Sequence, residues 1–163
     1  KTVEKTFKKL QIVSAGLMAF AHGQNDAQKA MGIITMALLS AGLLVEPNIP
    51  LWVVLTCATA MALGTAAGGW RIMKTMGDKI VELEPMNGFA AETAAASVLF
   101  TTAHFGMPVS TTQVISGGIF GVGTAKDWKK VNWKLARTML TTWIVTIPAT
   151  GLISYVIFGL IGK

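Results

Sequence analysis

The chain has 163 residues, of which 52% are hydrophobic and only 13% are charged, and its mean hydropathy is +0.56. A soluble domain carries about 25% charged residues and hides its apolar surface, so this composition excludes a soluble protein and predicts an integral membrane protein. The net charge of +6 does not indicate a nucleic-acid partner, because the cations lie in short clusters between apolar runs, which is typical of membrane proteins.

The first part of the chain predicts a broken helix over residues 10–45. Apolar runs at 10–22 and 30–45 are each too short to span a membrane, which takes about 20 residues. The polar segment GQNDAQK at 23–29 separates them. We therefore expect one crossing made of two half-helices that meet at this polar segment.

A second interpretation of the start is a signal peptide, since a basic beginning is followed by an apolar stretch and by Ala19-Phe20-Ala21. The membrane-like sequence that continues beyond it makes this the weaker interpretation. Because the chain begins with Lys1 and not with Met, we expect a fragment or a processed product.

The remaining elements follow from alternation of apolar runs with charged or Pro-containing segments. All of them together form one transmembrane domain over residues 1–163. The sequence predicts a turn at 46–50, a spanning helix at 51–70, a charged loop at 71–85, a helix pair or hairpin at 86–125 with a break at 106–108, a basic loop at 126–134 and a last helix at 135–161.

The distribution of cations predicts how the chain lies in the membrane. Residues 1–9, 71–79 and 126–137 carry four, three and five of the 14 Lys and Arg. Positive segments mark the cytoplasmic side, so we expect a multi-pass protein of the cell membrane with its N-terminus in the cytoplasm and its C-terminus outside. The number of crossings is then odd, whether 86–125 crosses fully or forms a re-entrant hairpin, and an inverted repeat requires an odd number.

Two short motifs have the chemistry of helix starts. Asn25-Asp26-Ala27-Gln28 and Ser110-Thr111-Thr112-Gln113 each place a good N-cap residue three positions before Gln. The free N–H groups and partial positive charge of a helix start bind anions, and the hydroxyl groups add donors for a tetrahedral oxyanion. The candidate substrate-binding residues are Asn25, Asp26, Gln28, Ser110, Thr111, Thr112 and Gln113.

Asp26 and Glu92 are acids within apolar sequence. An unpaired Asp at the centre of a bilayer costs about 3 kcal/mol or more, so Asp26 needs Lys29, a bound cation or a proton as its partner. Hard oxygen ligands suit Na⁺, which makes Asn25, Asp26 and Glu92 the candidate cation ligands. Two plainer interpretations stay open, namely a packing kink at residues 23–29 and a structural hydrogen bond at Glu92.

Signatures of enzymes are missing from the sequence. It contains no HExxH, no GxSxG and no Walker A motif, and its single cysteine, Cys57, excludes a disulfide framework. We therefore expect no enzyme and no cofactor beyond transported ions.

The two motifs and two further segments resemble the inorganic phosphate transporters of the PiT type. That family carries G-x-N-D and P-V-S-[ST]-T in each of two inverted halves, and this chain is similar to the C-terminal half. Where many members have His after S-T-T, this chain has Gln113, which can cap a helix but cannot titrate. The matching segments are GQNDAQKAMG at 23–32, GFAAETAAA at 88–96, PVSTTQ at 108–113 and GVG at 121–123.

The resemblance implies an all-α integral membrane bundle with two broken or re-entrant helices, which forms one inverted-repeat half of a transporter. It implies symport of inorganic phosphate with Na⁺ or H⁺ by alternating access, with phosphate near Asn25, Asp26 and residues 110–112. The implied partners are phosphate, the coupling ion and the N-terminal half of the same transporter. Whether the chain instead folds alone or pairs with a second copy in a homodimer stays open. The alternatives are transport of sulfate or another oxyanion, an uncoupled anion pore and a membrane subunit that transports nothing.

Overall fold

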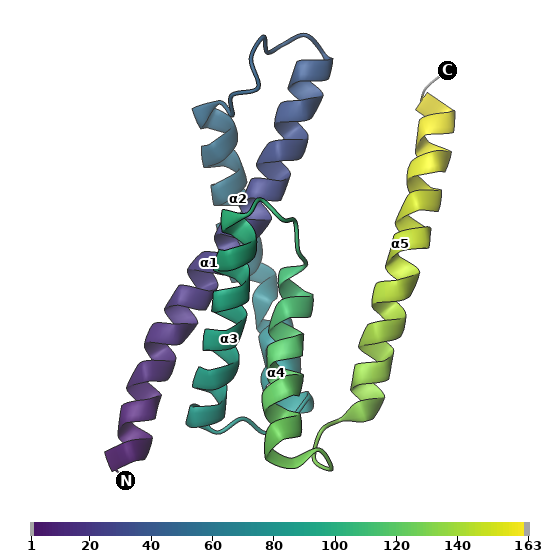
Figure 1. The fold of residues 1–163 in the computed structure, drawn as a ribbon. Helices are drawn as coiled ribbons and strands as arrows, with labels where there is room; N and C mark the ends of the chain where they lie inside the picture. Colours follow the sequence, from purple (N-terminus) through teal and green to yellow (C-terminus); the bar gives the residue numbers. More distant parts are fainter. Residues whose placement is uncertain (1, 162–163) are drawn as a thin grey trace.

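The computed structural model describes residues 2–161, and all regular structure in this part of the chain is helical (Figure 1). The predicted all-α class is therefore confirmed. The elements in chain order are α1 (Thr2–Ser40), α2 (Leu51–Lys74), the π-helix η1 (Thr75–Lys79), α3 (Pro85–His104), α4 (Thr111–Asp127) and α5 (Trp133–Ile161).

Helix α1 runs unbroken for 39 residues, so the predicted division of residues 10–45 into two half-helices is wrong. The polar side chains at its middle find partners without opening the helix. Asn25 donates to the carbonyl of Ala21 at 2.9 Å and to that of Leu99 in α3 at 3.3 Å. At 1.5 Å per residue α1 is about 58 Å long, well beyond the ~30 Å of a bilayer's hydrocarbon core.

Helix α1 ends in a Schellman motif. The N–H of Leu43 donates to the carbonyl of Leu38 at 2.9 Å, and the N–H of Gly42 donates to the carbonyl of Leu39 at 3.0 Å. Gly42 has a φ of 70°, a left-handed conformation that glycine adopts without the steric cost of a Cβ. The chain then passes through the predicted turn at 46–50 into α2.

The helices α2 and α5 agree with the predicted spanning segments. The stretches Leu51–Trp70 and Trp133–Ile161 are long and apolar enough to cross a membrane. The segment 71–85, predicted as a loop, is helical in its first part, because α2 continues to Lys74 and η1 follows it. Helix α5 continues through Pro148.

Helices α3 and α4 form an antiparallel hairpin in the segment 86–125, for which the sequence predicts a helix pair or hairpin. The chain turns at Gly106, whose φ is 64°. Helix α4 approaches α3 closely at Gly118, where a Cβ would stand 3.0 Å from the carbonyl oxygen of Ala91. Figure 1 shows that the tip of the hairpin reaches only partway along α1 and α2, whereas its base lies at the end where the N-terminus lies.

An ion pair joins the two helices at the base of the hairpin. Lys126 lies near the end of α4, and its Nζ is 2.7 Å from Oε1 of Glu84, which directly precedes α3. The hydrogen bond from Lys126, followed by its charge, lowers the pKa of the Glu84 carboxyl below its ordinary value. Exposed pairs of this kind contribute little to stability, so the contact mainly keeps the two helix ends together.

Two buried clusters hold these helices in place. The first joins α1 to α2, and the second joins the α2–α3 connection to the hairpin. Their members are Ala27, Met31, Val53 and Cys57 in the first and Ile80, Val81, Ala91 and Ile119 in the second.

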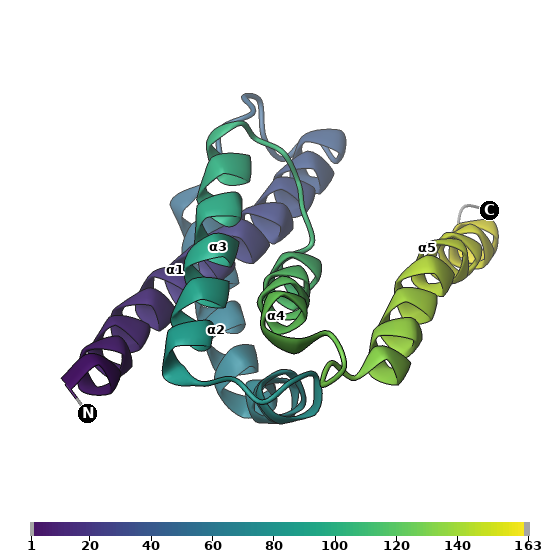
Figure 2. The same cartoon turned by 60° about the horizontal axis from the view of Figure 1, so that its bottom comes forward.

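Helix α5 stands apart from the other helices in both views (Figures 1 and 2). Ala136 is its one buried residue among those that the structure describes. The exposed apolar side chains of α5 therefore require lipid or further protein around them. In Figure 1 the described end of α5 lies at the opposite end of the bundle from the start of α1.

Candidate anion-binding site

The carboxylate of Asp26 lies near the middle of α1 with three polar side chains around it. His22 Nε2 lies 3.0 Å from Oδ2, and Lys29 Nζ lies 2.8 Å from Oδ1. These two residues share a face of the helix with Asp26, because they are four positions before it and three after it. Thr111, the first residue of α4, donates its hydroxyl to Oδ2 at 3.0 Å. The sequence left Lys29, a bound cation or a proton open as the partner of Asp26, and the structure shows Lys29.

Lys29 connects α1 with the tip of the hairpin. Besides its contact with Asp26, Lys29 Nζ donates to the carbonyl of Val109 at 2.6 Å. Val109 lies in the connection that leads into α4, 80 positions further along the chain. The side chains of Lys29 and Asp26 remain 35% and 27% exposed, so both are accessible from the adjoining cavity.

Helix α4 begins as the sequence predicts, with Ser110 as its N-cap. The Ser110 hydroxyl oxygen accepts the N–H of Gln113 at 3.4 Å, and the backbone of Ser110 is extended. Pro108 disfavours helical geometry at the residue before it, which separates α4 from α3. The first N–H groups of α4 have no partner within the helix and carry partial positive charge, so this end favours an anion.

A cavity of about 430 Å³ lies where the middle of α1 meets the start of α4. Since one water takes about 30 Å³ in the liquid, the cavity has room for a small oxyanion with several waters. Its lining brings together an ammonium group, a carboxylate, three hydroxyls and a helix N-terminus. The lining residues are Asp26, Lys29, Pro108, Val109, Ser110, Thr111 and Thr112.

Four of the seven predicted substrate-binding residues line this cavity. The other three do not. The side chain of Asn25 is buried and bonded to backbone carbonyls of α1 and α3. Gln28 is exposed on α1, and Gln113 contributes its backbone N–H to the cap of α4. The four that line the cavity are Asp26, Ser110, Thr111 and Thr112.

The structure does not bring the three predicted cation ligands together. Glu92 accepts a hydrogen bond from the Ser14 hydroxyl at 2.5 Å. Ser14 and Asp26 are twelve positions apart on one helix, which is about 18 Å along its axis. Within residues 2–161 no group of three His, Cys, Asp or Glu side chains is arranged to hold a metal ion. Asn25, Asp26 and Glu92 therefore do not form one cation site in this chain.

Three groups belong to the site although they are absent from the predicted substrate and cation residues. The spacing of His22 and Lys29 about Asp26 was a signal in the sequence, because residues three and four apart face each other on a helix. The carbonyl of Val109 had no such signal. It takes part through its backbone, and only the tertiary fold brings it to Lys29.

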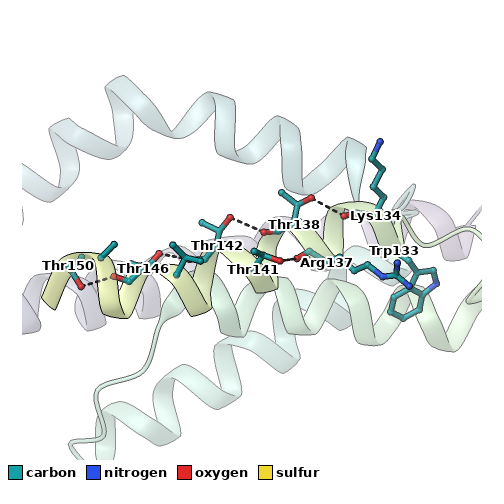
Figure 3. A pocket seen from close by; sticks show the side chains of 10 residues that line it. Trp133, Lys134, Arg137, Thr138, Thr141, Thr142, Thr146 and Thr150 are labelled. Atoms are coloured by element: carbon teal, nitrogen blue, oxygen red, sulfur yellow. Dashed lines mark hydrogen bonds between the residues drawn. The ribbon is translucent and has the colours of Figure 1, made fainter. Parts of the chain in front are cut away.

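A larger cavity, of about 910 Å³, lies along α5 and is lined by α5 alone (Figure 3). The hydroxyls of its five lining threonines donate to carbonyls on the same helix, for example from Thr142 to Thr138 at 2.8 Å and from Thr146 to Thr142 at 2.6 Å. They are therefore already paired within the helix. The groups suited to an oxyanion converge instead at the Asp26 cavity. The threonines are Thr138, Thr141, Thr142, Thr146 and Thr150.

Comparison with known sequences gives matches over nearly the whole chain. Residues 1–154 match the phosphate transporter family. A probable low-affinity inorganic phosphate transporter of Bacillus subtilis (strain 168) is 50% identical over 161 residues, which cover 96% of this chain and 48% of that protein. A protein of the same description from Rhizobium meliloti (strain 1021) is 53% identical over 153 residues, or 93% of this chain and 46% of the relative. The chain thus spans about half the length of the curated relatives it matches.

A solved structure described as the sodium-dependent phosphate transporter is similar to the fold, with a TM-score of 0.82 and 31% sequence identity. The similarity covers 98% of this chain and 41% of that structure. These relatives are described as phosphate transporters, and the apolar helical composition of this chain agrees with a membrane protein. The sequence match from residue 1 to residue 154 shows that the chain belongs to the phosphate transporter family.

Proposed function

We propose that this chain forms one half of a cation-coupled phosphate symporter that works by alternating access. The observation that carries the proposal is the cavity in which Lys29, Asp26 and the hydroxyl-bearing start of α4 converge within an apolar bundle. Each phosphate oxygen accepts hydrogen bonds, so the anion matches a lining of ammonium, hydroxyl and backbone donors. The descriptions of the relatives favour phosphate over sulfate, whose shape would fit the same donors.

The arrangement of the two chain ends supports an inverted pair of halves. The described ends lie at opposite ends of the bundle, so a second copy joined in tandem would enter the membrane in the opposite direction. The greater length of the relatives agrees with such a pair. We therefore propose that the N-terminal half of the same transporter completes the site, with a homodimer of this chain as the alternative.

The basic segments support an orientation in the membrane. The start of α1, the α2–α3 connection and the α4–α5 connection lie at one end of the bundle, and this is the end proposed to face the cytoplasm (Figure 1). A test replaces Cys57 by Ala and introduces Asn48→Cys or Lys129→Cys. An impermeant thiol reagent applied to intact cells should label the cysteine at 48 and leave the one at 129 unlabelled; the reverse pattern contradicts the proposed orientation.

Sodium is proposed as the coupling ion, with the proton as the alternative, because the similar solved structure is described as sodium-dependent. The test uses the full-length transporter in proteoliposomes and follows radiolabelled phosphate and sulfate under an inward Na⁺ gradient, a pH gradient or neither. We expect phosphate to accumulate only with the Na⁺ gradient. Accumulation with a pH gradient alone would make the proton the coupling ion. Equilibration without either gradient would indicate an uncoupled pore, and preferred uptake of sulfate would contradict the substrate.

A further inference from the structure

A covalently attached cation, the Lys29 ammonium group, lies beside Asp26 at the position where a coupling ion could otherwise bind. Oδ1 lies 2.8 Å from Lys29 Nζ and 3.3 Å from the Thr111 hydroxyl. Oδ2 lies 3.0 Å from the same hydroxyl and 3.0 Å from His22 Nε2. A carboxylate offers about four lone-pair sites, and four contacts surround this one. A Na⁺ ion at Asp26 would therefore have to displace one of these contacts, and the charge of Lys29 would repel it.

We propose that Lys29 is a built-in countercation that neutralises Asp26 in this half, in place of a coupling ion, and that it sets the affinity for phosphate. The inference rests on the proposed function. With Lys29 present, the charged side chains that line the cavity are one cation and one anion. An incoming phosphate is then not repelled. Without Lys29 the same lining would carry a net negative charge, and a dissociable cation would be needed at Asp26 before an anion entered.

The ammonium group of Lys29 also has an N–H donor left for the substrate. It carries three N–H donors, and the structure uses two of them, for Asp26 and for Val109. The third is available to a phosphate oxygen in the cavity that Lys29 lines. Because Lys29 also holds Val109, an anion that draws the ammonium toward itself weakens a contact at the hairpin tip. Binding of substrate is thereby linked to the position of the tip.

The test compares the full-length wild-type transporter with Lys29→Met and Lys29→Arg in proteoliposomes. Lys29→Met should raise the KM for phosphate at least about tenfold, because removal of one member of a close charge pair leaves the other uncompensated. Its uptake should also depend more steeply on Na⁺ concentration, since Asp26 is now free to bind a cation. Lys29→Arg keeps the charge and should retain the wild-type Na⁺ dependence. A Lys29→Met transporter with the wild-type Na⁺ dependence or the wild-type KM overturns the inference.

A second comparison covers the case in which Lys29→Met does not fold. Equilibrium binding of radiolabelled phosphate is measured for Asp26→Asn and for the double variant Asp26→Asn/Lys29→Met, both of which lack the carboxylate. Phosphate should bind at least about tenfold more weakly to the double variant, because only the single variant keeps the ammonium. Equal affinities overturn the inference. A wild-type transporter that accumulates no phosphate contradicts the proposed function itself, whereas wild-type accumulation with these outcomes contradicts only the role of Lys29.

Discussion

The hydroxyl of Thr111 donates to Asp26 Oδ2 across 3.0 Å and so joins the first turn of α4 to the middle of α1, 85 positions earlier. The contact connects the anion-favouring end of one helix with a charged side chain of the other. The site therefore depends on both helices keeping their relative position.

Replacement of Thr111 by Val removes this donor while keeping the shape of the side chain. A hydrogen bond to a charged group contributes about 1.5–3 kcal/mol, so we expect the KM for phosphate to rise about tenfold or more. Thr111→Ser keeps the hydroxyl and should stay near the wild-type KM. Uptake kinetics in proteoliposomes measure both variants, and equal KM values for Val and Ser would show that the hydroxyl does not act on the substrate site.

Replacement of Asp26 by Asn removes the negative charge that His22, Lys29 and Thr111 contact. We expect Na⁺-driven accumulation of phosphate to fall at least about tenfold, because the three contacts lose their charge-assisted strength. Glu46→Gln, in the exposed α1–α2 connection, is the control and should transport normally. Unimpaired accumulation by the Asp26 variant would refute the role of this carboxylate.

Replacement of Ser110 by Ala removes the N-cap of α4. Loss of such a cap costs about 0.5–2 kcal/mol, so the apparent melting temperature in detergent should fall and the KM for phosphate should rise. Ser110→Thr keeps a capping hydroxyl and should preserve both values. An alanine variant with wild-type melting and KM would show that the cap does not support the cavity.

Replacement of Gly118 by Ala should destabilise the hairpin. Its Cβ would stand 3.0 Å from the Ala91 carbonyl oxygen, and overpacking of this kind costs about 1–3 kcal/mol. Gly121→Ala is a matched control on the same helix, because apart from its chain neighbours and the helix's own backbone no atom lies within 4 Å of a Cβ there. We expect the control to be neutral or slightly stabilising, since Ala favours helix over Gly. Thermal unfolding measures the pair, and equal melting temperatures would contradict close packing at Gly118.

Replacement of Glu84 by Gln should change the response of stability to acid. Because Lys126 lowers the pKa of Glu84 in the folded protein, the pair stabilises the protein above the ordinary pKa of about 4.5, and this contribution is lost as pH falls through the folded pKa. The variant should therefore melt slightly below wild type at pH 7 and converge with it in acid. The effect is small because Glu84 is exposed. If the variant and the wild type still differ in melting temperature in acid, the Glu84–Lys126 pair is not the cause of the difference.

Several features of this protein could be predicted from local sequence alone. The apolar composition and the long runs predict membrane helices, and α2 and α5 follow those runs closely. Ser110 caps α4 as predicted, because Pro108 prevents a helix from continuing there and the capping hydroxyl acts within four residues.

The segment at 23–29 shows where local sequence is insufficient. Asn and Asp favour helix starts when their side chains lack other partners. Here the side chain of Asn25 donates to the carbonyl of Leu99, 74 positions away. The hydroxyl of Thr111, 85 positions away, donates to the carboxylate of Asp26. Because both side chains have these partners, the helix continues. The separation of Glu92 from Asp26 likewise depends on how α3 lies along α1.

The amino-acid sequence by itself determined that the chain is helical and membrane-embedded, where the α3–α4 connection breaks, and which family motifs it carries. Only the tertiary structure decided that α1 stays whole, that Lys29 reaches Val109, and that Asp26 meets the start of α4. The physical reason is the distance along the chain over which each effect acts. Hydropathy and capping act within one or two helical turns, whereas the partners of buried polar groups come from helices that only the fold brings together.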